Sequence, residues 1–498
     1  MRNSFVFLCA LVFTVPLTAS AATEAPFEVT GWIPYWRVAT GTADTLPHLD
    51  TLTEVNPFVY TIRNDGTLRD NGALEAEPWL SFIATARAKN VRVIPTVMSS
   101  GGETLHQLLS NQKSRIALED RIVALVKEGG YDGIDIDFEG KYAKDKDHFS
   151  TFLKGLDMRM GSKMIMCSVE SRTPLEDQYW GTSLPENAGV YANDLKEINK
   201  YCDRVRIMTY DQQGIDRKLV ATAASSTQLY APVADPAWVE KSIRFMMKDI
   251  SKSKILIGVP TYGYEYDVTA YEGKEYSYGI LWVFNPRYAT DIAAQYGITP
   301  QRNTAGEMYF TYVANAATST TPVSLGPTSA LFAALAATAY ADTYNSHLGF
   351  RLLDWPDAQS VQQKIDLAKK LGVRGVSIFK LDGGQDPAIW DVLKKVAEQG
   401  TIVESEFSSR PLARGLTLGT IGEDVRVLQK ILNSDAGTQV AASGVGSLGR
   451  ETIYFGPATA RAVQKFQVKY SIAKKGDSGY GYVGPNTRAK LNALLGGL

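Results

Sequence analysis

Asp132-Gly133-Ile134-Asp135-Ile136-Asp137-Phe138-Glu139 is the stretch of this sequence that decides the fold. Its acidic and apolar residues alternate, and a period of two is that of a β-strand, whose successive side chains point to opposite faces. The three carboxylates that share a face lie about 6–7 Å apart and repel one another. We therefore expect at least one of Asp135, Asp137 and Glu139 to stay protonated near neutral pH, as a general acid requires.

Seven further apolar runs accompany this strand, and helical patterns separate most of them. The expected strands are 29–36, 56–62, 91–98, 133–138, 163–169, 204–209, 255–261 and 375–381. Strands that alternate with helices in this way predict an α/β fold, a (β/α)8 TIM barrel, with an open doubly wound sheet as the alternative. In a barrel the acids point inward, and Glu139 lies nearest the C-terminal mouth, where barrel enzymes place their chemistry.

One connection is much longer than the others. About 95 residues separate Thr261 from a helix that Asp357 is expected to cap, and a loop of that length without structure of its own is uncommon. The segment is rich in tyrosine. We expect a small α+β insertion at about 263–355, with most of its aromatic residues in a core of its own.

The first residues resemble a secretory signal peptide. Arg2 precedes an apolar run at 5–17, and the small residues Ala19-Ser20-Ala21 follow it. A membrane anchor is the alternative, but the run is short and contains Pro16. We therefore expect 1–21 to be removed and the protein to be secreted, either extracellular or associated with the cell wall (periplasmic in a Gram-negative cell), with no membrane segment left.

The charge balance narrows the class of partner. The chain has 52 Lys and Arg residues against 53 Asp and Glu residues, so no broad basic surface is expected and nucleic acid is an improbable partner. Neutral polymers such as polysaccharides fit this balance. Two cysteines, Cys167 and Cys202, remain after signal removal. Export permits a disulfide between them, but both lie near apolar strands, and we favour two buried free thiols.

Two other interpretations of the acidic strand can be weighed. A calcium loop needs polar, loop-forming spacers between its acids, whereas the spacers here are Ile and Phe, so we expect no metal and no cofactor. A structural network that pairs the acids with Arg or Lys is the second alternative. Three inward acids on one strand are costly to bury without a function, which favours a catalytic site.

The last hundred residues differ from the barrel region in their pattern of apolar residues. Residues 401–414 have few apolar residues and predict a linker, and 415–498 predict a compact helical module. The module contains an internal repeat, Phe455-Gly456-Pro457 followed by Thr459, and Val483-Gly484-Pro485 followed by Thr487. In each copy we expect the threonine to cap a helix.

Four motifs in the barrel region together resemble glycoside hydrolase family 18, the chitinase-like family, and in particular its bacterial cell-wall branch. Asp132-Gly-Ile-Asp-Ile-Asp-Phe-Glu139 is similar to the family's D-G-x-D-x-D-x-E signature. Ser99-Ser-Gly-Gly102, Met208-Thr-Tyr-Asp211 and Val259-Pro-Thr-Tyr-Gly263 resemble its other motifs and follow in family order. The resemblance covers about 27–398, within an expected catalytic domain at 22–400.

The resemblance implies substrate-assisted, retaining catalysis. Glu139 would protonate the leaving oxygen, while the substrate's own 2-acetamido oxygen attacks the anomeric carbon. Asp137 would orient the acetamido N–H, and Asp135 would support Asp137. Tyr210 and Asp211 would hold the acetamido group and the distorted sugar. Substrates would then carry a 2-acetamido group at the cleavage site, as in chitin, N-glycan cores and peptidoglycan.

The same resemblance implies a substrate-binding set with one departure from the family pattern. The expected set is Trp32, Tyr35, Met208, Tyr262 and Phe379. The family usually has Trp where Phe379 stands, as the floor of the cleavage subsite, and Phe would stack more weakly on a sugar. A catalytically weak or inactive lectin that binds cell wall or chitin is therefore the alternative to an enzyme.

The C-terminal module resembles the peptidoglycan-binding domain of cell-wall hydrolases. Gly422-Glu-Asp-Val425, Phe455-Gly456 with Thr459, and Val483-Gly484 with Thr487 follow its pattern. A helical dimerisation or stability domain is the alternative. The two resemblances together predict a glycosidase acting on β-1,4 linkages of an N-acetylglucosamine polysaccharide, with peptidoglycan favoured over chitin and the module attached to the wall.

Overall fold

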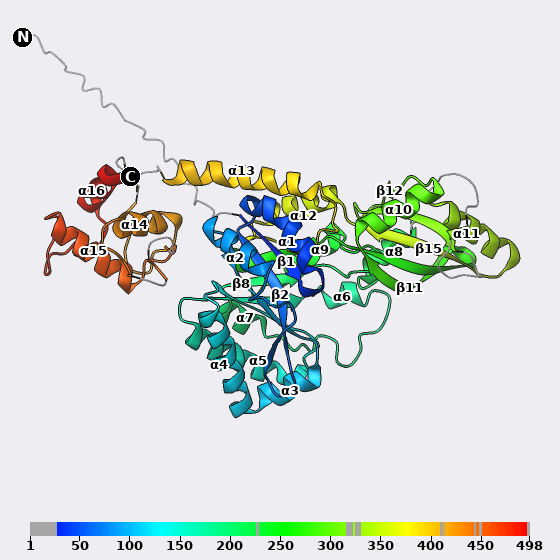
Figure 1. The fold of residues 1–498 in the computed structure, drawn as a ribbon, viewed down its shortest axis with the longest axis horizontal. Coiled ribbons are helices and arrows are strands. Elements are labelled where there is room, and N and C mark those ends of the chain that lie inside the picture. The colour runs from blue at the N-terminus through cyan, green and yellow to red at the C-terminus, as the bar shows by residue number, and fades with distance from the viewer. Residues whose placement is uncertain are drawn as a thin grey trace, which may run out of the picture. The chain divides into compact units, whose positions relative to one another are not determined.

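The computed structural model describes residues 27–225, 229–314, 322–323, 330–408, 412, 414–442, 445–447 and 451–495. The predicted signal peptide lies outside these residues. The described chain falls into two compact units, Pro26–Phe407 and Ser408–Leu498, which we describe separately (Figure 1). None of the helices in the described ranges is long and apolar enough to cross a bilayer.

The larger unit is built on a closed barrel of parallel strands, which confirms the predicted TIM barrel. The strand order is β1-β16-β9-β8-β7-β6-β5-β2, and β1 also pairs with β2, which closes the ring. The strands are β1 (Glu28–Pro34), β2 (Glu54–Ile62), β5 (Thr96–Ser99), β6 (Gly133–Phe138), β7 (Met164–Glu170), β8 (Arg204–Met208), β9 (Ile255–Pro260) and β16 (Gly375–Phe379). Two short strands, β3 (Leu68–Asp70) and β4 (Arg92–Val93), also pair with β2. Strands such as β9 are buried along their whole length, as expected when helices cover the outside of a parallel sheet.

Helices follow most of the strands. They are α1 (Val38–Thr45), α2 (Trp79–Ala88), α3 (Gly102–Ser110), α4 (Gln112–Glu128), α5 (Lys146–Met160), α6 (Leu175–Gln178), α7 (Leu195–Tyr201), α8 (Arg217–Ser225), α9 (Pro236–Met246), α12 (Ala358–Leu371) and α13 (Ile389–Ser408). Short 3-10 turns lie at Tyr35–Arg37, Leu46–Thr51, Ala143–Asp145, Lys252–Lys254 and Glu272–Lys274. The predicted cap of α12 is confirmed, since the Asp357 carboxylate accepts a hydrogen bond from the Ser360 N–H at 3.0 Å.

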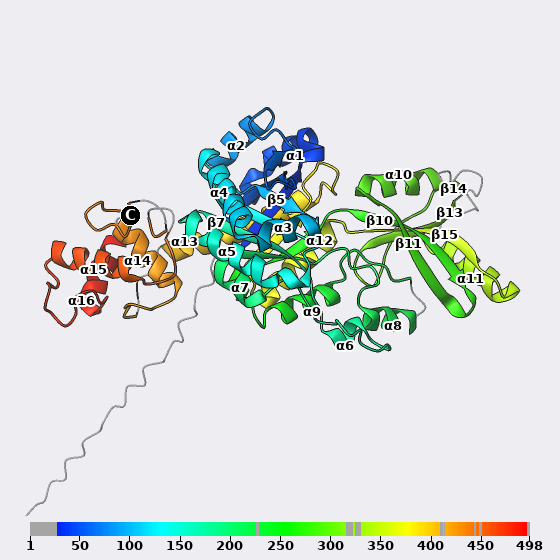
Figure 2. The ribbon, with the colours of Figure 1, turned by 90° about the horizontal axis from the view of Figure 1, so that it is seen from below.

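The long connection after β9 forms the expected α+β insertion, which lies beside the barrel (Figure 2). It contains β10 (Gly263–Tyr271), β11 (Glu275–Phe284), α10 (Pro286–Tyr296), β12 (Gln301–Arg302), β13 (Met308–Ala314), β14 (Pro322–Val323), α11 (Phe332–Tyr344) and β15 (Leu348–Trp355). Its antiparallel sheet has the order β11-β10-β15-β13-β12. Tyr264, Tyr266 and Phe284 are buried, whereas Tyr271 and Trp282 are exposed, so the aromatic residues divide between the core and the surface.

The two cysteines differ from the expectation. Cys167 and Cys202 are both buried, but they form a disulfide, with 6.0 Å between their Cα atoms. The expectation of two free thiols is therefore wrong. Cys202 lies just before β8, and the pairing of Cys167 with Val205 of β8 brings the two cysteines within the usual distance for a disulfide.

The smaller unit contains three helices, α14 (Glu423–Asn433), α15 (Pro457–Lys469) and α16 (Pro485–Leu495), in the part of it that the structure describes. The segment 401–414, expected to be a linker, continues α13 as far as Ser408, because no proline interrupts that helix before Pro411.

The internal repeat of this unit has a role other than helix capping. Gly456, not Thr459, is the N-cap of α15. The Thr459 hydroxyl is buried and accepts a hydrogen bond from Gln429 Nε2 at 2.9 Å, and Thr487 accepts the equivalent bond from Gln467 at 3.1 Å. The expected threonine cap is thus wrong for α15, because the side chain turns inward to satisfy a buried glutamine.

Candidate active site

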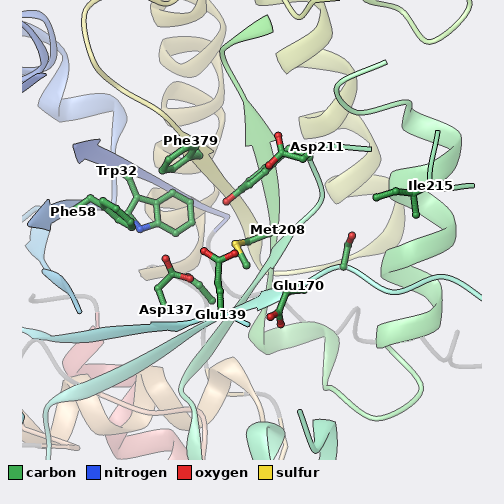
Figure 3. A pocket seen from close by; sticks show the side chains of 12 residues that line it. Trp32, Phe58, Asp137, Glu139, Glu170, Met208, Asp211, Ile215 and Phe379 are labelled. Atoms are coloured by element: carbon green, nitrogen blue, oxygen red, sulfur yellow. The ribbon is translucent and has the colours of Figure 1, made fainter. Parts of the chain in front are cut away.

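A cavity of about 320 Å³ lies at the C-terminal ends of the barrel strands (Figure 3). Side chains from β1, β2, β6, β7, β8 and β16, and from the segments that follow them, point into it. The lining residues are Trp32, Phe58, Asp137, Glu139, Ser168, Glu170, Ser171, Met208, Tyr210, Asp211, Ile215 and Phe379. Four of these residues are acids and none is basic, so the cavity has a negative lining.

Two glycines let the loop with Glu139 sit against the loop after β5. A Cβ on Gly102 would lie 2.6 Å from the carbonyl oxygen of Gly140, which is too close for any other residue. Gly140 itself has a φ of +63°, a conformation that glycine adopts readily. The Glu139 N–H donates to the Ser99 carbonyl oxygen at 2.8 Å. The Ser-x-Gly-Gly element therefore helps to fix the position of Glu139.

Asp135 is the lowest acid of β6 and lies beneath the cavity, fully buried. Its carboxylate accepts hydrogen bonds from Trp32 Nε1 at 3.0 Å, from Thr96 Oγ1 at 2.8 Å and from Ser168 Oγ at 3.0 Å. With these partners Asp135 is a satisfied side chain that anchors the indole of Trp32 at the base of the cavity.

A buried arginine completes the base of the site. Arg206 on β8 is fully buried, and its NH1 lies 2.8 Å from a carboxylate oxygen of Asp135. The same guanidinium forms an ion pair with the buried Glu54 of β2 and lies 4.8 Å from the centre of the Trp32 ring. For Asp135, therefore, the structural ion pair considered above is present.

Asp137, one step nearer the mouth, has a different environment. It is only 5 % exposed, and its Oδ1 atom has no hydrogen-bond partner among the described residues. Burial raises the pKa of Asp137 well above its usual range, and the nearby carboxylates of Glu139 and Asp135 raise it further. An orphaned carboxyl oxygen at a cavity wall is available to a ligand group such as an amide N–H.

Glu139 ends this row of acids and is half-buried in the cavity wall. Burial raises the pKa of the Glu139 carboxyl, the charges of Glu170 and Asp211 add to that effect, and Lys141 opposes it. Lys141 is itself buried, donates a hydrogen bond to the Phe138 carbonyl oxygen and has a pKa lowered by burial. The raised pKa favours the protonated form of this carboxyl group, which is the form that a general acid beside an open site needs.

Tyr210 and Asp211 follow β8 on the opposite side of the cavity. Asp211 has a φ of +59°, an uncommon conformation for a non-glycine residue that often marks a functional position. Its Oδ1 accepts hydrogen bonds from Tyr262 at 2.5 Å and from Tyr264 at 2.6 Å. Burial raises the pKa of the Tyr210 hydroxyl well above its usual range, so this side chain is a hydrogen-bond donor at any physiological pH.

Aromatic rings form the floor of the cavity. Phe379 stacks on Tyr210 at 5.7 Å between ring centres, and it meets Trp32 and Phe58 edge to face at 5.7 and 6.0 Å. Phe58 in turn contacts the exposed ring of Trp36 at 5.9 Å. The apolar floor thus continues from the base of the cavity toward the surface, as suits the flat apolar face of a sugar ring.

The structure brings together seven of the ten expected site residues at the cavity and places three outside it. Trp32, Asp137, Glu139, Met208, Tyr210, Asp211 and Phe379 line the cavity. Asp135 lies beneath it, and the buried Tyr262 reaches the site only through its hydrogen bond to Asp211. Tyr35 is exposed and packs on Trp36 instead, because the chain turns away from the barrel directly after β1.

Phe58, Ser168, Glu170, Ser171 and Ile215 line the cavity without having been expected there. Two signals were present in the sequence. Glu170 follows the apolar run of β7 directly, as Glu139 follows that of β6, and Arg206 is a charged residue inside a strand. Neither Glu170 nor Arg206 could be assigned a partner from the sequence, because the residues that each one faces lie on other strands.

Known proteins resemble this chain over the barrel region. The family model described as glycosyl hydrolases family 18 matches residues 29–384. The chain is 23% identical to the uncharacterized glycosylase YvbX of Bacillus subtilis, over 71% of this chain and 89% of that protein. It is 22% identical to the cortical fragment-lytic enzyme of the same species, over 68% of this chain and 67% of that protein.

Solved structures share the fold. The spore cortex-lytic enzyme SleL of Bacillus megaterium superposes with a TM-score of 0.53 at 19% identity, covering 76% of this chain and 75% of that chain. The C-terminal domain of a putative chitinase from Desulfitobacterium hafniense has a TM-score of 0.55 at 20% identity, covering 76% of this chain and 99% of that chain. At these identities the likeness shows the fold alone.

Proposed function

The chain belongs to the glycosyl hydrolases of family 18, and on that premise we propose that it hydrolyses β-1,4 linkages beside N-acetylglucosamine in bacterial peptidoglycan, with chitin-like oligomers as second substrate. As a glycoside hydrolase of this family it acts on a polysaccharide. The choice of glycan, the bond and the reaction course are the proposal. We also propose that the protein is exported and works outside the cytoplasm.

The observation that carries the proposal is the pair Asp137 and Glu139, which line one cavity from β6 and from the residue directly after it. Glu139 has the raised pKa of a general acid and donates its proton to the glycosidic oxygen. The Oδ1 atom of Asp137, which has no partner among the described residues, accepts a hydrogen bond from the N–H of the substrate's 2-acetamido group. The acetamido oxygen attacks the anomeric carbon and closes an oxazolinium ring, while the C–O bond to the leaving sugar breaks. Water then adds to the anomeric carbon and gives a proton to Glu139, and the bond from that carbon to the acetamido oxygen breaks.

The other residues of the cavity have positioning roles in this proposal. The Tyr210 hydroxyl, which stays protonated, and Asp211, held by two tyrosines, bind the acetamido group and the distorted sugar ring. Trp32 and Phe379 support the apolar face of that sugar. Met208 closes the wall beside Glu139.

Peptidoglycan is favoured over chitin on two grounds. The cortical fragment-lytic enzyme matches 68% of this chain, whereas a chitinase of Drosophila melanogaster and an endochitinase of Caenorhabditis elegans match only 33% and 34% of it. The C-terminal module also resembles a peptidoglycan-binding domain. Within that module Tyr454 and Tyr482 occupy equivalent positions of the repeat, and both rings are exposed, at 49 % and 41 %. Exposed aromatic rings are suited to stacking on sugars.

Digestion of purified sacculi and of N-acetylglucosamine oligomers tests the proposal. The wild type is expected to release reducing ends from both, and mass spectrometry of reduced products should show N-acetylglucosamine at the new reducing end. Products ending in N-acetylmuramic acid would contradict the proposed bond. Binding of both glycans without release of reducing ends would instead favour the lectin alternative. The observation that supports this alternative is Phe379, which stands where the family usually has Trp.

The C-terminal module is expected to raise the rate of hydrolysis on insoluble substrate only. Deleting residues 416–498 should lower the initial rate on intact sacculi by about tenfold, because the loss of a second binding site lowers the effective concentration of enzyme at the wall. The rate on soluble oligomers should stay within about twofold of wild type, because the barrel is a separate compact unit. Initial rates on both substrates, with a sedimentation assay on sacculi, measure the effect.

A milder variant tests whether the loss comes from glycan binding and not from removal of the whole module. Tyr454→Ala combined with Tyr482→Ala keeps the helices of the module, since both side chains are exposed, and should reproduce most of the loss of sedimentation. If the deletion lowers both rates equally, the module stabilises the barrel and has no targeting role.

A further inference from the structure

Glu170 lies next to Glu139 in the cavity wall. Strands β6 and β7 run parallel, and their register pairs Gly133 with Met164 and Ile136 with Cys167. Continuing that register residue by residue sets Glu170 opposite Glu139, and neighbouring strands lie about 4.8 Å apart. Both side chains line the cavity, and in Figure 3 the carboxyl group of Glu139 points toward Met208 while that of Glu170 points the other way.

The carboxylate of Glu170 is fixed by its own partners. Asn193 Nδ2 donates a hydrogen bond to Glu170 Oε2 at 2.7 Å, and Asn193 is only 5 % exposed. The backbone carbonyl of Asn193 accepts from the Arg172 guanidinium at 3.4 Å, and Arg172 stacks over the ring of Tyr191 at 3.7 Å. Glu170 is therefore held in place by a short network and remains in the wall of the cavity.

We propose that Glu170 is a positioning residue for the reaction, whose negative charge keeps the neighbouring Glu139 in the protonated form that donates to the leaving oxygen. This inference rests on the proposed function, in which Glu139 is the acid. Two carboxylates that share a site disfavour each other's charge. After burial, the charge of Glu170 is the largest cause that raises the pKa of Glu139.

Other charges face Glu139 and set the background for this effect. Asp137 on β6 and Asp211 after β8 are further acids in the cavity, and Tyr210 stays neutral. Lys141, on the loop after β6, is the cation that faces both Glu139 and Glu170, and it lowers the pKa of Glu139. When the charge of Glu170 is removed, the positive charge of Lys141 acts on Glu139 without the opposing charge of Glu170. The pKa of Glu139 therefore falls.

The pH profile of kcat/KM tests this role. Glu170→Gln keeps the shape of the side chain and an oxygen that can accept from Asn193, and removes only the charge. The variant should be close to wild type on the acidic side of the profile. On the alkaline side, where Glu139 loses its proton earlier, it should fall about five- to tenfold below wild type. Glu170→Asp restores the charge and should recover most of that loss.

A matched control removes the same charge outside the cavity. Glu176 lies on α6, six residues further along the chain, and its side chain is exposed, so Glu176→Gln should leave the profile unchanged. An unchanged alkaline limb with a raised KM in Glu170→Gln would overturn the proposal, because it would show that Glu170 binds a sugar hydroxyl. Loss of activity at every pH would also overturn it, because it would place Glu170 in the chemistry itself.

A second measurement does not depend on turnover. The carboxyl carbon of Glu139 can be followed by ¹³C NMR in protein labelled at glutamate, with Glu139→Gln used to assign its signal. Its titration should move to lower pH in Glu170→Gln and not in Glu176→Gln. An unmoved titration overturns the inference even in an active enzyme. A moved titration in a protein that cleaves neither sacculi nor oligomers would leave the coupling established and refute the proposed function instead.

Discussion

Glu139→Gln is expected to lower kcat on N-acetylglucosamine oligomers by about 10²- to 10⁴-fold, which is the contribution of a positioned general acid. Glutamine has the shape of the protonated glutamate but gives no proton to the leaving oxygen. The apolar floor formed by Trp32 and Phe379 is untouched, so KM should change by less than about threefold. Steady-state rates and single-turnover rates on the same oligomer measure the two effects separately.

The exposed Glu176→Gln again provides the control for a loss of one carboxylate, and its kcat should equal that of the wild type. The same comparison on sacculi shows whether one acid serves both substrates. Retention of more than about a tenth of the wild-type kcat by Glu139→Gln would contradict the assignment of Glu139 as the acid. A raised KM with unchanged kcat would contradict it as well, because that pattern indicates a residue that binds ground state and transition state equally.

Arg206→Met is expected to have the largest effect on stability, a loss of about 3–5 kcal/mol in the free energy of unfolding. The guanidinium is fully buried and forms ion pairs with Asp135 and Glu54, which are also fully buried. Methionine fills a similar volume but leaves the buried Asp135 without its cation. Glu54 keeps only its ion pair with Arg92, at 3.1 Å. Urea unfolding followed by tryptophan fluorescence reports on the barrel unit alone, because the 8 tryptophans all lie between Trp32 and Trp390.

The matched control is an arginine in an exposed ion pair. Arg244 pairs with Glu240 on α9 at 2.8 Å, and its side chain is 58 % exposed, so Arg244→Met should cost less than about 1 kcal/mol. Adding Asp135→Asn to Arg206→Met should recover part of the stability, because the unpaired buried charge is then removed. Equal unfolding midpoints for Arg206→Met and Arg244→Met would refute a stabilising role for the buried pair.

Much of the barrel could be predicted because it depends on local patterns. The expected strand 133–138 coincides with β6, and the strand expected at 29–36 is β1 at Glu28–Pro34. The insertion was expected because the chain between Thr261 and Asp357 is too long for a loop. The expectations that were wrong concern contacts between distant segments, namely the bond between Cys167 and Cys202 and the inward-facing Thr459.

The acidic strand by itself determined that three carboxyl groups share one face of β6, because alternation along a strand is a property of the local backbone. Only the closed barrel decided which side chains surround each of the three carboxyl groups. It set Asp135 against Arg206, left an oxygen of Asp137 without a partner and placed Glu170 beside Glu139. Arg206 lies 71 residues after Asp135 in the sequence, and Glu170 lies 31 residues after Glu139. The pKa of a carboxyl group depends on the charges around it in space, and the spacing of residues along the sequence does not give those charges.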